Sequence, residues 1–222
     1  MMLTRHRVRH SIWVVFVMLG IGLAAGVYAP EVLAFPYKAQ FGNTVVRSER
    51  PLPADFGRTI EAADALVAKS ALYHGPVSRR IFLTDGGWRW RLMALQLDGT
   101  VAFTRPLGNL IVVCDADPAA DSARNHIRFP GIRTLHDTIA HETTHILINN
   151  HFGVLQAAQF PRWKVEGYAD YIAGTSSLSD ARAALVRRQD PYNPALVYYD
   201  GRKRVAAALA RDPNVDRFFL RP

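Results

Sequence analysis

The chain of 222 residues contains a single cysteine, Cys114, so no disulfide can form within it. Cys114 ends an apolar run, and we expect a small buried side chain rather than a reactive thiol. Apart from one short motif, no cluster of Cys and His residues indicates a metal site. The sequence also has no internal repeats and no low-complexity tract. Its length and composition therefore suit one compact domain with an N-terminal extension.

The chain is basic, but not in the pattern of a nucleic-acid-binding protein. Its formal net charge is +8, of which Arg5, Arg7 and Arg9 contribute +3 and the remainder of the chain +5. No basic cluster is interleaved with aromatic side chains, so nucleic acid is not an expected partner. The excess could attract the domain to anionic lipid headgroups or an acidic envelope polymer. A general richness in arginine explains it equally well, and we favour that explanation.

The N-terminal region has a long stretch without charge. Residues 12–29 are eighteen consecutive uncharged residues, just enough to span a bilayer and long for the core of a signal peptide. The positive-inside rule places the basic residues 1–10 in the cytoplasm and the remainder of the chain outside it. We therefore predict a hydrophobic helix over residues 11–30 that anchors an exported domain in the cell membrane. The alternative is a cleaved signal peptide and a secreted domain.

The most informative motif is H-E-x-x-H at residues 141–145. In a helix, residues four apart lie on one face, so His141 and His145 can chelate one metal ion. Glu142 lies between them, where its carboxylate can reach a water molecule at the metal without being a ligand itself. Such a motif arises by chance in roughly one chain in two hundred of this length, so its context decides its meaning.

The context of the motif predicts a helix over residues 135–150. Thr134 and Asp137 have the spacing of a capping box, which satisfies free N–H groups at the start of a helix. Apolar residues then recur at helical spacing, and Gly153 supplies a stop.

A second helix is predicted between Pro161 and Gly174. Glu166 lies twenty-one positions after His145, a gap that allows the chain to turn and return onto the first helix. It would complete the three protein ligands that a catalytic zinc site typically has. Asp170 lies four residues further on the same face, where it could orient a ligating histidine. The alternatives are a solvated residue for Glu166 and a surface salt bridge for Asp170.

These motifs resemble those of the gluzincin metallopeptidases, the thermolysin-like clan, in which H-E-x-x-H is followed about twenty residues later by E-x-x-x-D. Residues 163–171 are similar to the W-x-x-E-G-x-A-x-Y signature of small peptidase MA-like members. The resemblance is confined to residues 134–174. It implies a minimal catalytic domain in which His141, His145 and Glu166 bind Zn²⁺ and Glu142 is the general base.

A peptidase of this kind also needs a hydrogen-bond donor for the oxyanion besides zinc. Gluzincins often supply a Tyr or His from a downstream helix, and Tyr198 and Tyr199 lie in the corresponding region, with Tyr168 and Tyr171 as further candidates. The sequence does not separate Tyr198 from Tyr199. His136 and His151 flank the motif helix, and we expect neither to be a ligand.

Gly167 directly follows Glu166 in the predicted second helix. Glycine inside a helix costs about 0.5–1 kcal/mol relative to alanine, so a packing reason is expected. We predict that Gly167 lets the second helix approach the first one closely.

The order of elements predicts an α+β fold, in which a small mixed sheet precedes the metal-binding helix, the glutamate helix and C-terminal helices. Residues 31–53 are expected to be an extended spacer, and residues 54–222 the gluzincin-like metallopeptidase domain. We take residues 110–113 as the edge strand that could bind a substrate by strand addition. Strands are predicted at 42–48, 80–84, 100–103 and 110–113, and helices at 56–72, 181–188, 195–199 and 202–210, with another short element at 88–92.

The sequence thus predicts an exported, membrane-anchored zinc peptidase that acts on a peptide or protein substrate. Zinc would supply an activated water at neutral pH, and Glu142 would accept its proton and pass it to the leaving amine. One alternative is a non-catalytic zinc-binding interaction module of the cell envelope. Another is zinc-dependent hydrolysis of a non-peptide amide in the cell wall.

Overall fold

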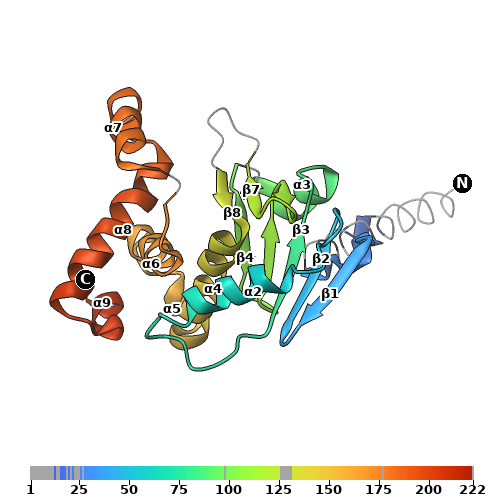
Figure 1. Cartoon of the computed structure of the whole chain (residues 1–222), viewed down its shortest axis with the longest axis horizontal. Coiled ribbons are helices and arrows are strands. Elements are labelled where there is room, and N and C mark those ends of the chain that lie inside the picture. Colours follow the sequence, from blue (N-terminus) through green and yellow to red (C-terminus); the bar gives the residue numbers. More distant parts are fainter. Residues whose placement is uncertain are drawn as a thin grey trace, which may run out of the picture.

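A computed structural model describes residues 28–97, 99–125, 132–176 and 178–221, together with a few positions between 13 and 26. The fold is α+β, as predicted, with a small mixed sheet and several helices. In Figure 1 the sheet lies in one half of the molecule and the C-terminal helices in the other, with the helix of the H-E-x-x-H motif between them.

The main sheet has five strands in the order β1-β2-β3-β5-β4. Its centre is parallel, because β2 pairs with β3 and β3 with β5 in parallel, while β1 and β4 add antiparallel edges. The strands are β1 (Tyr37–Phe41), β2 (Thr44–Ser48), β3 (Arg79–Leu83), β4 (Ala102–Arg105) and β5 (Leu110–Val113). Strands β1 and β2 lie in the region expected to be a spacer, so this region contributes to the sheet.

The prediction that residues 110–113 form the edge strand is wrong. Strand β5 lies between β3 and β4, and all four of its residues are buried. Among the described strands, β4 is the one at this edge of the sheet. Strand order is set by pairings between distant segments, and a hydrophobic run such as Leu110–Val113 is typical of a strand covered on both faces.

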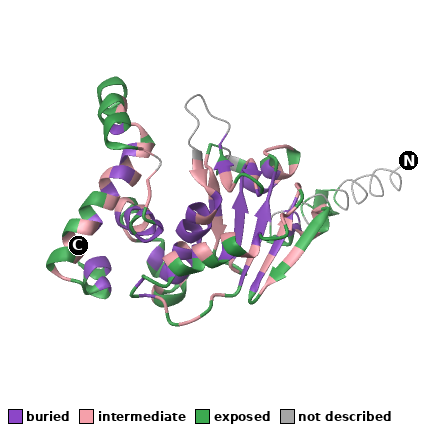
Figure 2. Ribbon diagram, in the orientation of Figure 1, coloured by how far each residue is buried: buried purple, intermediate pink, exposed green. Residues whose placement is uncertain are grey.

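The alternation of side chains along the central strands divides the core into two layers. Figure 2 shows that the central strands consist mostly of buried residues. Ile81 and Ile111 point to the face that is covered by α2 (Gly57–Val67) and α4 (Leu135–Phe152). Phe82 and Val112 point to the opposite face, where they pack against α3 (Trp88–Ala94). The sheet therefore separates α3 from the motif helix α4.

Helix α4 begins as the sequence predicts. The Thr134 hydroxyl accepts a hydrogen bond from the backbone N–H of Asp137, which is one half of the expected capping box. Thr134 also ends a small three-stranded antiparallel sheet that leads into the helix. This sheet consists of β6 (Ala116–Asp117), β7 (Ser122–Arg124) and β8 (Ile132–Thr134).

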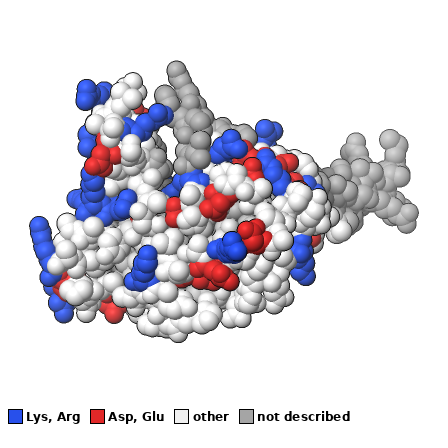
Figure 3. Space-filling view, viewed as in Figure 1, with Lys and Arg blue, Asp and Glu red and all other residues white. Residues whose placement is uncertain are grey.

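The C-terminal part of the described chain is helical. The prediction of separate helices at 195–199 and 202–210 is wrong, because one continuous helix passes through Gly201. Over these helices basic side chains gather, whereas both signs of charge are interspersed over the sheet (Figure 3). The helices are α5 (Val154–Ala157), α6 (Arg162–Ala173), α7 (Asp180–Gln189), α8 (Pro194–Arg211) and α9 (Val215–Leu220).

Gly167 permits a close helix contact, but with a different helix from the one predicted. A Cβ atom at Gly167 would lie only 2.4 Å from the backbone carbon of Gly201 in α8. A Cβ atom at Gly201 would likewise lie 2.7 Å from the carbonyl oxygen of Trp163 in α6. Two facing glycines thus let α6 and α8 pack backbone against backbone. The second helix is pressed onto α8, and its other side is left to face α4.

The predicted anchor over residues 11–30 lies almost entirely outside the described residues. Among the residues that the structure does describe, no helix is both long enough and apolar enough to cross a membrane.

We predict that Gly167→Ala lowers the free energy of unfolding by about 1–3 kcal/mol, because the added methyl group forces α6 and α8 apart. Urea denaturation measures the change. The matched control is Gly57→Ala at the start of α2, where the new Cβ would meet the Phe41 ring at an ordinary 3.5 Å. Equal stabilities of the two variants would show that the glycine contact is not a tight one.

Candidate metal centre

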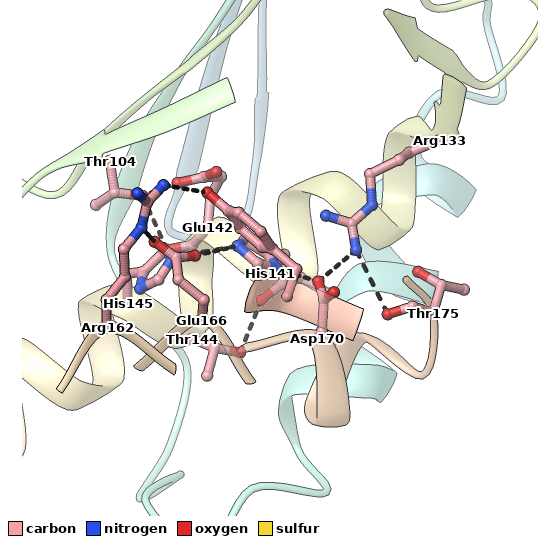
Figure 4. Close-up of polar contacts among 12 residues, drawn as sticks. Thr104, Arg133, His141, Glu142, Thr144, His145, Arg162, Glu166, Asp170 and Thr175 are labelled. Carbon is pink, nitrogen blue, oxygen red and sulfur yellow. Dashed lines mark hydrogen bonds and ion pairs between the residues drawn. The ribbon is translucent and has the colours of Figure 1, made fainter. Parts of the chain in front are cut away.

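Three side chains from two helices converge at one point (Figure 4). Helix α4 supplies His141 and His145, and α6 supplies Glu166. The Nε2 atoms of the two histidines are 3.2 Å apart. The Oε2 atom of Glu166 lies 3.3 Å from Nε2 of His141 and 3.5 Å from Nε2 of His145.

This triangle has the dimensions of a metal site. Ligand atoms about 2.0–2.1 Å from a tetrahedral zinc ion lie about 3.3–3.4 Å from one another. The three observed separations fall around that value. Among the described residues, His141, His145 and Glu166 are the group whose ligand atoms come close enough to hold a metal ion. The fold therefore brings together the three residues that the sequence predicts as metal ligands, and they could hold a metal ion. We refer to these three residues as the metal-binding group.

The orientation of His141 is fixed by a carboxylate behind it. Its Nδ1 atom lies 2.8 Å from Oδ1 of Asp170, which can only accept, so Nδ1 carries a proton and Nε2 is the ring atom that faces Glu166 and could ligate a metal ion. Arg133 donates to the same Oδ1 atom at 2.5 Å. Asp170 is completely buried, so this ion pair offsets the cost of placing its charge in the interior.

The charges around His141 favour a cation at this point. Burial disfavours a charged imidazolium, but hydrogen bonds to Asp170 and Glu166 outweigh it and raise the pKa of His141 to about 9. Burial also opposes ionisation of Glu166, yet the charge of His145 and hydrogen bonds to both histidines lower its pKa. Both carboxylates thus favour positive charge at His141, and a divalent ion would have to displace the proton from its Nε2 atom to bind there.

Glu142 lies beside this group and is held by strand β4. The Thr104 hydroxyl is 2.7 Å from Oε2 of Glu142 and 2.9 Å from its backbone oxygen. A single hydroxyl proton can be donated to only one of these acceptors at a time. The contact joins the edge strand of the sheet to the motif helix, and it was not predicted.

Tyr198 is brought to the metal-binding group. Its ring stacks over that of His141, with centroids 6.2 Å apart, and its hydroxyl accepts a hydrogen bond from Arg162 at 3.1 Å. Burial, together with the charge of Glu166, raises the pKa of Tyr198 to about 12. The hydroxyl therefore keeps its proton at neutral pH and can act as a donor.

Tyr199 points away from the metal-binding group. Its hydroxyl donates to Asp180 at 2.6 Å and accepts from Lys203, on a different face of α8. Successive residues of a helix point about 100° apart, so only one of two adjacent tyrosines can face the centre. Tyr168 is also turned away, since it is buried with its hydroxyl against Ser70.

The two flanking histidines pair with carboxylates elsewhere. His136 contacts Asp121, and His151 contacts Asp216. Neither belongs to the metal-binding group.

The metal-binding group and Glu142 line a groove with a volume of about 1350 Å³. Strand β4 forms one wall, α4 and α6 carry the polar centre, and α7 with the start of α8 forms the opposite wall. Its lining includes apolar side chains such as Val101, Ile148 and Leu185 as well as the basic residues Arg162 and Arg182. A groove of this size and composition can accept an extended chain.

Three contributing residues escaped the sequence analysis. Arg133 and Thr104 act across distances of 37 and 38 positions, which no local pattern reveals. Arg162 lies one helical turn before Glu166, and this spacing could have indicated the pair.

Comparisons of the chain with protein-family models, curated proteins and solved structures find no match.

We predict that Asp170→Asn weakens Zn²⁺ binding by about 10–100-fold, as is typical when the partner of a ligating histidine loses its charge. Competition with a chromophoric chelator measures the dissociation constant, and circular dichroism verifies the fold. The control is Asp180→Asn, whose carboxylate contacts Tyr199 rather than the centre. An unchanged affinity in a folded Asp170→Asn protein would contradict the role of this carboxylate.

Proposed function

We propose that the protein is an exported, membrane-anchored zinc peptidase of the gluzincin type. The observation that carries the proposal is the joint placement of three residues that could hold a metal ion and a further carboxylate, Glu142, in the wall of one groove. The similarity of residues 134–174 to gluzincin motifs supports the same conclusion.

A structural zinc site usually has four protein ligands, whereas a catalytic site keeps one position for water or substrate. In the part of the chain that the structure describes, the group consists of three residues, and no fourth His, Cys, Asp or Glu joins it. This favours catalysis over a non-catalytic interaction module of the cell envelope.

A bound zinc ion supplies Lewis acidity, which makes a water molecule more acidic and polarises a substrate carbonyl group. Glu142 accepts the proton of that water on its carboxylate and passes it to the nitrogen of the leaving amine. Thr104 holds this carboxylate in place through its hydroxyl. Tyr198 donates from its protonated hydroxyl to the negative oxygen that develops on the substrate.

Strand β4 is the proposed binding edge for the substrate backbone. The N–H of Cys114 donates to the carbonyl of Val101, which marks Val101 as a residue whose backbone faces β5. In an antiparallel pair this orientation alternates, so the backbone groups of Ala102 and Thr104 face the open edge. A peptide that adds a strand there lies along the groove and next to Glu142.

We expect Glu142→Gln to keep its zinc and to lose about 10²–10⁴-fold in turnover, because the amide cannot accept the proton. The purified full-length protein is assayed on a broad peptide library, and zinc is measured in parallel. If the wild type is fully loaded with zinc and as inert as the variant, the proposed peptidase activity fails.

Two adjacent residues give a matched test of the oxyanion donor. Tyr198→Phe is expected to lower kcat by about 10²–10³-fold with little change in zinc content, since only the donor hydroxyl is lost. Tyr199→Phe removes the same atom from a side chain that contacts Asp180, and its kcat should match the wild type. A loss of the same size in both variants would contradict the assignment of Tyr198.

A further inference from the structure

Six large apolar side chains are exposed on the side of the domain where the described chain begins. Each has between 43% and 68% of its surface exposed. A protein in water rarely exposes so many large apolar groups in one region without a partner for them. We call this group the apolar collar; it consists of Tyr28, Val32, Trp88, Leu95, Leu97 and Leu107.

The collar comes from three segments that contact one another. Residues 28–34 are tied to α3, because Arg89 donates to the carbonyl of Leu33 at 2.8 Å. They are tied to the turn between β4 and β5, because Arg80 bridges Glu31 and the carbonyl of Gly108. The guanidinium of Arg105 lies over the ring of Tyr28 and donates to the carbonyl of Met93 in α3. The collar residues therefore share one side of the domain.

The sequence next to the collar indicates what covers it. The uncharged run of residues 12–29 ends at the collar and is long enough to span a bilayer. Tryptophan, tyrosine and leucine beside arginines are typical of the interfacial layer of a membrane. Within the collar segments the basic residues are Arg89, Arg91 and Arg105, and the one acid is Glu31. Arg89 is paired with Glu49 at 2.6 Å, so the positive charge that suits anionic headgroups comes from Arg91 and Arg105.

We infer that the apolar collar rests in the headgroup layer of an anionic bilayer and fixes the orientation of the domain on the membrane. The inference rests on the proposed membrane anchor, but not on the proposed peptidase activity. The collar surrounds α3, which the sheet separates from α4, so the metal centre lies on the other side of the sheet. Leu97 of the collar also lines the groove, so one end of the groove lies at the collar, while residues of α7 line another part of it.

The test places a fluorescent probe at defined positions of the full-length chain in vesicles of phosphatidylethanolamine and phosphatidylglycerol. Leu95→Cys and Leu107→Cys carry an environment-sensitive dye within the collar. Leu155→Cys and Tyr192→Cys carry it at exposed positions in α5 and just before α8. The wild type is the labelling blank, because its one cysteine, Cys114, is buried.

Flotation of the vesicles first shows whether the chain is anchored. Lipids that carry a spin label near the headgroup should then quench the dyes at positions 95 and 107 and leave those at 155 and 192 bright. If the chain floats but all four dyes are quenched equally, or none is quenched, the collar does not rest in the headgroup layer. The proposed membrane anchor would stand in either case. A chain that does not float overturns both the collar and the anchor. A last outcome is that the dyes at positions 95 and 107 are unaffected by spin-labelled lipid but change their emission as the amount of protein per vesicle rises. Such a result would assign the collar to a second copy of the chain and overturn the inference.

Discussion

Nε2 of His141, Nε2 of His145 and Oε2 of Glu166 lie within 3.5 Å of one another. This convergence constrains how the helices of the protein pack. Two of these atoms belong to α4, whose residues are buried over most of its length, so this helix cannot shift without disturbing the core. The third belongs to α6, which lies between α4 and α8. The facing glycines Gly167 and Gly201 fix α6 against α8, and Lys164 ties it to the chain end through the carbonyls of Phe219 and Arg221.

Buried charge is balanced on both sides of α4. Towards the groove, the buried Asp170 is neutralised by Arg133 and oriented towards His141. Behind the helix, the fully buried Arg79 donates to Thr143 inside the motif and pairs with Asp64 of α2. Removal of one partner from such a pair leaves an uncompensated charge in the interior, which is strongly destabilising. These pairs therefore favour one position of the motif helix, which hydrophobic packing alone would not specify.

The sequence predicts local features of this fold better than distant ones. Helix α4 is recognisable from its cap, its periodicity and its stop, and Glu166 from its place in a second helix. The position of β4 at the edge of the sheet depends on pairings between distant segments, although the composition of the two strands already differs. Strand β5 is wholly hydrophobic, as a central strand tends to be, whereas β4 mixes apolar and polar residues. Tyr198 and Tyr199 are indistinguishable until the rotation of α8 about its axis is known. That rotation depends on the contact with α6.

The same contact links the proposed metal ligand, Glu166, to the proposed oxyanion donor, Tyr198. Glu166 directly precedes Gly167 on α6, and Tyr198 lies three residues before Gly201 on α8, hence on nearly the same face. Where the two glycines touch, Glu166 is directed to the histidines and Tyr198 to the ring of His141. A side chain at either glycine would move both groups together. The chemistry that we propose for this groove thus depends on a backbone contact that carries no functional group of its own.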